Sequence, residues 1–466
     1  MNAFQEAPKS KKMITLVGIY LGILASLVQS STLSTILPIA SMEIGGMEIY
    51  PLASVVGGIL SVVAMPLYGF LGAKNPALKR TLVLISLITG VIVLFTRAMA
   101  ASMMVIVVMS FFYGLVSAGI YVICYSMIRD MFNQVQAGVY LGLVGTMASI
   151  GMLVGPVLTG FLITYVGWRV VCHIIWIGLA ISAVLIFMGV KVTKEQVENL
   201  AIKINFDAAG TIILAVFLAC LILPLSLGNN FLPFGSPVNS GMLAVAVISL
   251  IALIMVIRKK GGNAIIPATV LKDKTTLLLS LLNLLLNFSS MAIFFFIPSY
   301  VIYILGQSAL YATISSAMLA VMGVFIGPIL GKAIAKAGNA RTVLTSATIV
   351  RIVVTLGFIL LLKPSTSIYV VWALMFIAGY YNSTQSVTFS TAPQIQVRPD
   401  IRLQSNSVIQ MSQNIGSSIG MTIYTIILMS PTLGLANGMP VALWVATAAA
   451  AIALVLGLML KKLEIA

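Results

Sequence analysis

Residues 142–160 read GLVGTMASIGMLVGPVLTG and carry no charged side chain. A run of this kind approaches the roughly 20 apolar residues that a helix needs to cross a bilayer. Within it lie the glycines and the proline of one motif: Gly142, Gly151, Gly155, Pro156 and Gly160. Glycines at these spacings let a neighbouring helix approach closely, and an internal proline removes a backbone donor and bends a helix. The stretch predicts a bent membrane helix with a tightly packed face, and ordinary helix packing is the alternative reading.

The chain around this stretch has the composition of a membrane protein. Of its 466 residues, 60% are apolar and 8% are charged. Soluble domains carry about 25% charged residues, so this chain has too few charges to build a surface that faces water. We expect an all-α polytopic membrane protein whose surroundings are the lipid bilayer.

Fourteen segments are apolar enough for us to expect that they span the membrane. Their approximate bounds are 13–40, 50–72, 81–96, 102–128, 139–165, 169–190, 208–228, 239–257, 275–304, 309–331, 342–362, 368–392, 404–430 and 440–460. An even number of spans places both ends of the chain on the same side of the membrane.

The distribution of Lys and Arg orients the chain. Of 26 such residues, only Arg97, Arg169 and Lys363 fall at one set of segment ends and Arg351 falls inside a segment, which leaves 22 on the opposite side. Cytoplasmic loops carry an excess of Lys and Arg. We therefore expect a multi-pass protein of the cell (inner) membrane with both termini in the cytoplasm. The net charge of +16 follows from the same bias and gives no reason to expect a nucleic acid partner.

Two long inner loops divide the chain into parts. Residues 191–207 and 258–274 bracket the seventh and eighth segments, and removing that pair leaves six segments on each side in parallel orientation. Many transporters are built from two such repeats about an axis along the membrane normal. We expect an N-terminal six-helix bundle at 1–190, two inserted helices at 191–274 and a C-terminal six-helix bundle at 275–466. The Gly155–Pro156 bend is expected at the contact between the two bundles.

A loop pattern occurs once in each half. Residues 69–80 read GFLGAKNPALKR and residues 331–341 read GKAIAKAGNAR, so each combines a glycine turn with basic residues. The second copy contributes Gly331, Gly338 and Arg341 to the residues expected to take part in conformational change. The alternative is an ordinary positively charged inner loop.

These stretches together carry a family resemblance. The motif at 142–160 resembles the antiporter motif of major facilitator drug exporters, with Thr159 in place of one glycine, and both loops resemble the facilitator loop motif. Further matches at 28–32, 167–169, 206–210 and 414–420 resemble the fourteen-helix drug:proton antiporter-like family of the major facilitator superfamily. The resemblance implies two six-helix bundles plus two inserted helices. It also implies a secondary active transporter that works by alternating access and exports lipophilic molecules.

The chain departs from that family at charged positions. Gln29 stands where the resemblance implies an Asp in the first helix, and Ser110 stands where it implies an Arg in the fourth. In the loop motif, Ala73 and Ala335 stand where the family carries an acidic residue. Charges at the first two positions are tied to proton movement in the family, so their absence makes a standard drug:proton antiporter a weaker match.

The resemblance implies that segments 13–40, 102–128, 275–304 and 368–392 line a central cavity. Polar residues in these segments and in 404–430 are therefore candidates for a substrate pathway: Gln29, Ser34, Tyr113, Ser117, Tyr121, Tyr125, Asn283, Asn287, Tyr381, Asn382, Gln385, Gln410 and Gln413. Residues four apart on a helix share one face, which applies to the Tyr113–Tyr125 series. The alternative is that such groups only hold helices together, at about 0.6 kcal/mol each.

Few ionisable residues fall inside the predicted spans. Arg351 is one, and a charged residue at that depth is a functional candidate, although it could instead cap backbone carbonyls. Helix-end carboxylates and the single histidine are candidates for coupling to protons: Glu43, Glu48, Asp130 and His173. Because no carboxylate is expected in mid-membrane, we expect a neutral or anionic amphiphilic substrate.

Other classes of function fit the sequence poorly. One histidine, three scattered cysteines and no phosphate-binding loop argue against an intramembrane enzyme, an ATP-driven pump or a metal site. We expect no cofactor, a small-molecule substrate and a monomer. The alternatives are a carrier for uptake or exchange of an organic anion or metabolite and, from a different class, an intramembrane enzyme or sensor.

Overall fold

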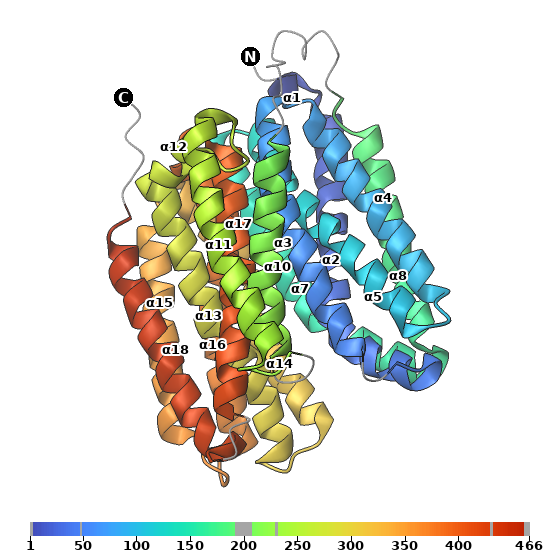
Figure 1. Ribbon diagram of the computed structural model, residues 1–466, viewed down its shortest axis with the longest axis vertical. Coiled ribbons are helices and arrows are strands. Elements are labelled where there is room, and N and C mark those ends of the chain that lie inside the picture. The colour runs from blue at the N-terminus through green and yellow to red at the C-terminus, as the bar shows by residue number, and fades with distance from the viewer. Residues whose placement is uncertain (1–2, 47–48, 192–206, 229–231, 429–431, 461–466) are drawn as a thin grey trace.

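The computed structural model describes residues 3–46, 49–191, 207–228, 232–428 and 432–460. Throughout these ranges the chain forms helices and connecting turns, and no strand occurs in them. This confirms the all-α class. Figure 1 shows the long helices running side by side, with the short helix α1 (Ala3–Glu6) and the short helix α12 (Ala268–Lys272) at one end of the molecule. That end is called the terminal end below.

The first group of helices runs from α2 to α8. Its members are α2 (Lys9–Ile44), α3 (Tyr50–Lys74), α4 (Leu78–Ala98), α5 (Met103–Ala118), the π-helix η1 (Gly119–Cys124), α6 (Tyr125–Met131), α7 (Gln134–Val166) and α8 (Trp168–Met188). Most of their buried apolar side chains form one cluster. The helices α5, η1 and α6 follow one another without a break, so the expected fourth span contains a turn of π-helix. Such turns are rare and occur frequently at functional sites.

The remaining helices form a hairpin and a second group. The hairpin consists of α10 (Ala208–Leu227) and α11 (Pro237–Lys260), followed by the short 3₁₀ turn η2 (Gly261–Asn263) and α12. The second group consists of α13 (Lys274–Tyr303), α14 (Ala309–Ala337), α15 (Arg341–Leu361), α16 (Ile368–Gln396), α17 (Arg402–Leu428) and α18 (Gly434–Leu458). The hairpin touches both groups, because α10 packs against α3 and α17.

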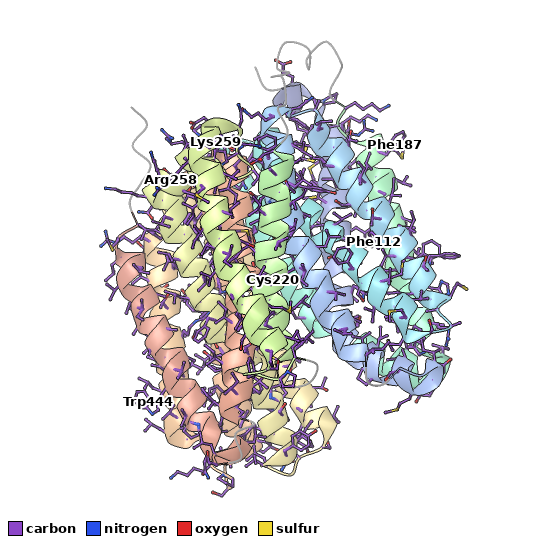
Figure 2. All side chains as sticks on the ribbon, viewed as in Figure 1. Phe112, Phe187, Cys220, Arg258, Lys259 and Trp444 are labelled. Carbon is purple, nitrogen blue, oxygen red and sulfur yellow. The ribbon has the colours of Figure 1, made fainter. Side chains whose placement is uncertain are left out.

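The outer surface has the character that a bilayer requires. Phe112, Phe187 and Trp444 are exposed along the sides of the molecule, whereas Arg258 and Lys259 lie near the terminal end (Figure 2). Apolar side chains that face lipid need no polar partner, and basic residues at helix ends reach the headgroups.

Within the described residues, twelve helical segments are long and apolar enough to cross a membrane. The helices α16 and α17 have 29 and 27 residues but are too polar to belong to that set. Their polar residues include Gln385, Gln410 and Gln413, which were expected to line a cavity. A helix that lines a polar cavity loses apolar character for that reason, and the count of fourteen spans stays a prediction.

The two groups of helices meet through glycines, although not at Gly155, where the contact was expected. Gly142 on α7 approaches so closely that an added Cβ would clash with the carbonyl oxygen of Gly327 on α14. Gly138 and Gly331 meet in the same way, one turn nearer the terminal end. The prediction for Gly155 is wrong, because a Cβ there would meet Ser31 of α2 within the first group. The side chains of residues 156–160, which include Pro156 and Gly160, lie outside the described part.

Candidate functional site

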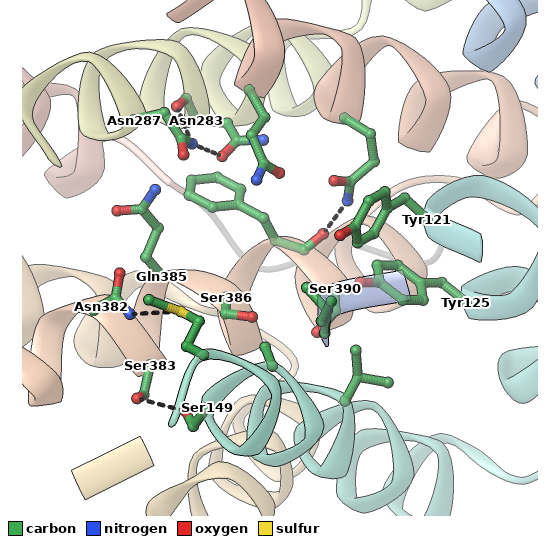
Figure 3. A pocket seen from close by; sticks show the side chains of 17 residues that line it. Tyr121, Tyr125, Ser149, Asn283, Asn287, Asn382, Ser383, Gln385, Ser386 and Ser390 are labelled. Carbon is green, nitrogen blue, oxygen red and sulfur yellow. Dashed lines mark hydrogen bonds between the residues drawn. The ribbon is translucent and has the colours of Figure 1, made fainter. Parts of the chain in front are cut away.

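A cavity lies between the two groups, roughly midway along the helices that form it (Figure 3). Its wall combines aromatic, hydroxyl and amide side chains with a few apolar ones: Leu27, Tyr121, Tyr125, Val144, Ala148, Ser149, Met152, Asn283, Asn287, Asn382, Ser383, Gln385, Ser386, Phe389, Ser390, Gln410 and Gln413. None of these lining residues is acidic or basic. The wall therefore offers hydrogen bonds and aromatic faces without a formal charge.

Eight of the residues expected in a substrate pathway meet in this wall: Tyr121, Tyr125, Asn283, Asn287, Asn382, Gln385, Gln410 and Gln413. They come from η1, α6, α13, α16 and α17. The sequence positions span almost 300 residues, so only the packing of the two groups brings these side chains together.

Amide side chains hold one side of the wall in place. The Nδ2 of Asn283 donates to the carbonyl oxygen of Ile409 at 2.7 Å, and the Nδ2 of Asn287 donates to the Asn283 Oδ1 at 2.8 Å. The Nε2 of Gln410 donates to the carbonyl oxygen of Phe389 at 2.8 Å. Figure 3 shows the bond between Asn287 and Asn283. The Asn283 and Gln410 bonds each join two helices, so the wall is preorganised.

The tyrosine face of the wall depends on the π-helical turn. Tyr121 lies within η1 and Tyr125 directly follows it, and their rings meet edge to face with centroids 6.0 Å apart. Tyr113 and Ser117 lie in α5, before this turn, and do not line the cavity although they were expected to share the face. The Nδ2 of Asn406 on α17 donates to the carbonyl oxygen of Tyr121 at 3.1 Å and so joins the second group to this turn.

Tyr113 belongs instead to a cluster around a buried arginine that the sequence analysis placed at a helix end. Arg97, in the last turn of α4, is 3% exposed and donates from Nη2 to the Ser110 hydroxyl at 2.5 Å. Its guanidinium also lies 5.6 Å from the centroid of the Tyr113 ring. Ser110 is the position where the family resemblance implies an arginine, so a guanidinium reaches this place from the neighbouring helix.

Three further pathway candidates do not line the cavity. Gln29 is buried on α2, and its Oε1 has no hydrogen-bond partner among the described residues. Tyr381 and Arg351 lie behind the wall, where the guanidinium stacks 4.3 Å from the centre of the tyrosine ring. The side chain of Ser34 lies outside the described part.

Sequence reasoning missed the contribution of α7. Ser149 and Met152 line the cavity and face Ser383 and Asn382 of α16; the two serine hydroxyls are 3.4 Å apart (Figure 3). These residues lie between Gly145 and Gly155 in the motif that was interpreted as a packing face. The sequence did hold one signal: Ser149 and Met152 are three residues apart, a spacing that places two side chains on the same face of a helix.

The described coupling candidates are all engaged near helix ends. Glu43 accepts from Trp168 Nε1 at 2.7 Å and from Arg169, and these hydrogen bonds hold the pKa of its carboxyl below the usual value. Asp130 pairs with Lys79 Nζ at 2.6 Å. His173 accepts at Nδ1 from Trp176 at 2.9 Å. Glu48 lies outside the described residues.

The second loop motif forms a helix terminus. Gly338 ends α14 with φ of 65°, in the left-handed region that favours glycine. Arg341 begins α15 and its side chain is exposed. The loop therefore has the glycine turn expected from the sequence.

Comparison with known proteins identifies the architecture around this cavity. A model of the Major Facilitator Superfamily matches residues 19–421. The chain belongs to the major facilitator superfamily. It is a membrane transporter and not an enzyme, as the sequence analysis predicted.

Relatives and solved structures agree with this membership. The chain is 22% identical to Multidrug resistance protein 3 of Bacillus subtilis (strain 168), over 90% of this chain and 80% of that protein. It is 24% identical to the multidrug transporter protein MdtP of the same organism, over 91% of this chain and 76% of the relative. The crystal structure of the human organic anion transporter MFSD10 has the same fold, with a TM-score of 0.65, 12% identity, and coverage of 97% of this chain and 100% of that one.

Proposed function

We propose that this major facilitator transporter exports lipophilic neutral or anionic small molecules by alternating access. The observation that carries the proposal is the uncharged cavity wall of amides, hydroxyls and tyrosines. A dication held there would lack a counter-charge, and an unpaired charge in a low-dielectric site costs several kcal/mol. The relatives named as multidrug proteins support export of lipophilic molecules.

The contacts between the two groups support alternating access. On α7 they run from Gln134, whose Nε2 donates to the carbonyl oxygen of Ala335, as far as Met152. On α17, Asn406 and Ser407 contact the first group near its start. Except for Met152, which lines the cavity, these positions lie towards the terminal end. If that end is cytoplasmic, as the charge distribution predicts, the structure is an outward-facing state.

The mechanism needs two bodies that rock about the cavity. We infer that residues 1–190 and 275–466 are those bodies, with the hairpin at 191–274 as an insertion and fourteen spans in all. The cavity measures about 160 Å³, whereas drug-sized ligands occupy sites of about 300–1,000 Å³. Binding a larger substrate therefore requires the lining helices to separate, which rocking of the two bodies provides.

Few groups in this structure could carry a proton that is coupled to transport. Glu43 and Asp130 are each paired with a basic residue at opposite ends of the molecule. Asp130 is the less exposed of the two and lies at the terminal end, where the groups meet. We infer that it is the better carboxylate for a role linked to conformational change, with the substrate's own ionisable group as the other route.

The proposal is tested by uptake into proteoliposomes. Cationic, neutral and anionic lipophilic solutes of similar size are compared with and without a pH gradient. We expect saturable transport of neutral or anionic members. Transport confined to cations would overturn the proposed substrate class, and no transport of any member would overturn the assignment as an exporter of lipophilic molecules.

A further inference from the structure

A buried guanidinium lies directly behind the cavity wall. Arg351 on α15 is 2% exposed. Its Nη1 donates to the carbonyl oxygen of Leu286 at 2.5 Å and to the Ser290 hydroxyl at 2.8 Å, and its Nη2 donates to Gln385 Oε1. The Tyr381 ring covers one face of the group. Every oxygen that accepts from Arg351 is therefore neutral.

Arg351 has no counter-charge among the residues that the structure describes. None of the four ion pairs in the described residues includes Arg351. A charged side chain within a membrane helix is costly and pairs with an opposite charge or with carbonyls. A carbonyl, a hydroxyl and an amide only partly offset the loss of hydration. The arrangement leaves a positive potential next to an otherwise uncharged cavity.

One edge of the guanidinium is poorly occupied. Within the described part of the chain, Nε has no hydrogen-bond partner, and Nη2 on the same edge donates only to Gln385. The edge formed by Nε and Nη2 is one of the two that bind a carboxylate through parallel hydrogen bonds. Nη1 is already held by α13 through Leu286 and Ser290. The edge that remains is thus the one suited to a planar oxyanion.

Gln385 separates this edge from the cavity. It lines the cavity, is 8% exposed, and also accepts from the Ser290 hydroxyl at 3.3 Å. Its amide oxygen occupies the position where one oxygen of a carboxylate would accept from Nη2. A rotation of this single side chain would open the arginine to a ligand in the cavity.

We propose that Arg351 is a subsite for a singly charged oxyanion, such as a carboxylate or sulfonate, and that Gln385 occupies it in the absence of substrate. The anionic group displaces the Gln385 amide and binds the Nε–Nη2 edge, while the lipophilic part of the molecule lies against Tyr121, Tyr125 and Phe389. This inference rests on the proposed function and narrows its substrate class to lipophilic monoanions.

The test uses two variants that add one negative charge to the same helix. Gln385→Glu places a carboxylate on Arg351, where it imitates the bound anion. Asn382→Asp places one in the same wall, next to Met152, on a side chain that accepts no hydrogen bond from Arg351. The probes are a coumarin-acetate and its methyl ester, which share a skeleton and differ by one charge. Binding to the purified full-length protein is measured by fluorescence, and the readout is the ratio of carboxylate to ester affinity.

We expect Gln385→Glu to lower this ratio by about tenfold or more, since hydrogen bonds to charged groups contribute about 1.5–3 kcal/mol. Asn382→Asp should lower it by clearly less, and Arg351→Gln should abolish the preference for the carboxylate. Equal effects of the two acidic variants would overturn the subsite, because repulsion of the anionic probe by any added negative charge in the wall would then explain both results. An unchanged ratio in Arg351→Gln would also overturn it. If the Arg351→Gln variant still transports the ester at the wild-type rate, the proposed function stands even though the subsite is wrong.

Discussion

Asn406 on α17 donates a hydrogen bond from Nδ2 to the carbonyl oxygen of Tyr121 at 3.1 Å. The bond joins the second group of helices to the only π-helical turn within the described residues, and Tyr121 itself lines the cavity. A π turn leaves backbone acceptors in altered positions, and this amide satisfies one of them. The relationship links the closure of the terminal end to the geometry of the binding site.

Replacing Asn406 with Ala should favour opening of the terminal end. Loss of a hydrogen bond of about 1 kcal/mol would shift the two-state equilibrium about fivefold. Spin labels at the exposed positions Gln136 on α7 and Lys336 on α14 report the separation by pulsed EPR. The matched control is Asn414→Ala, since Asn414 on the same helix reaches the first group only through a 3.9 Å contact to the Met65 sulfur and otherwise donates to the Gln410 carbonyl oxygen within α17 at 3.4 Å. Identical distance distributions in the two variants would contradict the role given to Asn406.

Gly142 should tolerate no side chain. A methyl group there would clash with the Gly327 carbonyl, and the helices α7 and α14 would have to separate. We expect Gly142→Ala to reduce transport at least about tenfold while the protein still inserts in the membrane, because overpacking a tight contact costs about 1–3 kcal/mol. Gly241→Ala on α11 is the control, as its added methyl meets nothing within 4 Å. Normal transport by Gly142→Ala would remove the glycine contact from the mechanism.

Asp207 should anchor the hairpin of α10 and α11. Burial alone would raise the pKa of this carboxyl, but hydrogen bonds from Lys260 Nζ at 2.6 Å and from the Gly210 and Ile265 amides outweigh burial and lower it. A lowered pKa means that the stabilisation is present at neutral pH and is lost as pH falls below the usual Asp range, near 3.8.

Thermal unfolding in detergent measures this contribution. Asp207→Asn should cost about 1–3 kcal/mol at neutral pH, and the difference from wild type should shrink as the pH falls through that range. Asp273→Asn is the control, because Asp273 also caps a helix through Thr276 and has no ion pair in the described residues. Equal losses in both variants would show that Lys260 contributes nothing.

Glu43 should stay ionised at physiological pH and so should not carry the coupling proton. Hydrogen bonds from Trp168 and Arg169 lower its pKa from 4.5, so the group releases its proton well below neutrality. We expect Glu43→Gln to retain transport driven by a pH gradient, whereas Asp130→Asn should lose it and leave Lys79 buried without its carboxylate partner. Loss of the pH response in Glu43→Gln alone would reverse this assignment.

The orientation of the chain can be tested on the hairpin. Single cysteines at Phe234 and Gly262, in a background without Cys124, Cys172 and Cys220, are treated with a thiol reagent that does not cross the membrane. Both positions are exposed. We expect labelling of position 234 in intact cells and of position 262 only after lysis. Labelling of position 262 in intact cells would show that the chain has the opposite orientation in the membrane.

Much of the fold was predictable because apolar runs and basic loops follow from the bilayer itself. The cavity was predictable only in part. Spacing placed Tyr121 and Tyr125 on one face, but it did not indicate the π-helical turn at Tyr121, whose carbonyl oxygen accepts from Asn406, 285 residues distant. The partners of Arg351 lie 65 and 34 residues away on other helices, and no local pattern indicates them.

Two features of α7 show the same limit of local patterns. Gly142 and Gly155 look alike in the sequence, yet one packs against α14 and the other against α2. Ser149 and Met152 lie in the same glycine motif and line the cavity. Which face of a helix meets which neighbour depends on the crossing of the two groups, and a single sequence does not encode that in its spacing.

The most direct test of the central claim compares two fluorescent dyes of similar size in proteoliposomes, one dicationic and one carrying a carboxylate in place of the cationic groups. The uncharged cavity wall and the neighbouring Arg351 predict saturable transport of the carboxylated dye and none of the dication. Saturable, pH-driven transport of the dication alone would contradict the account.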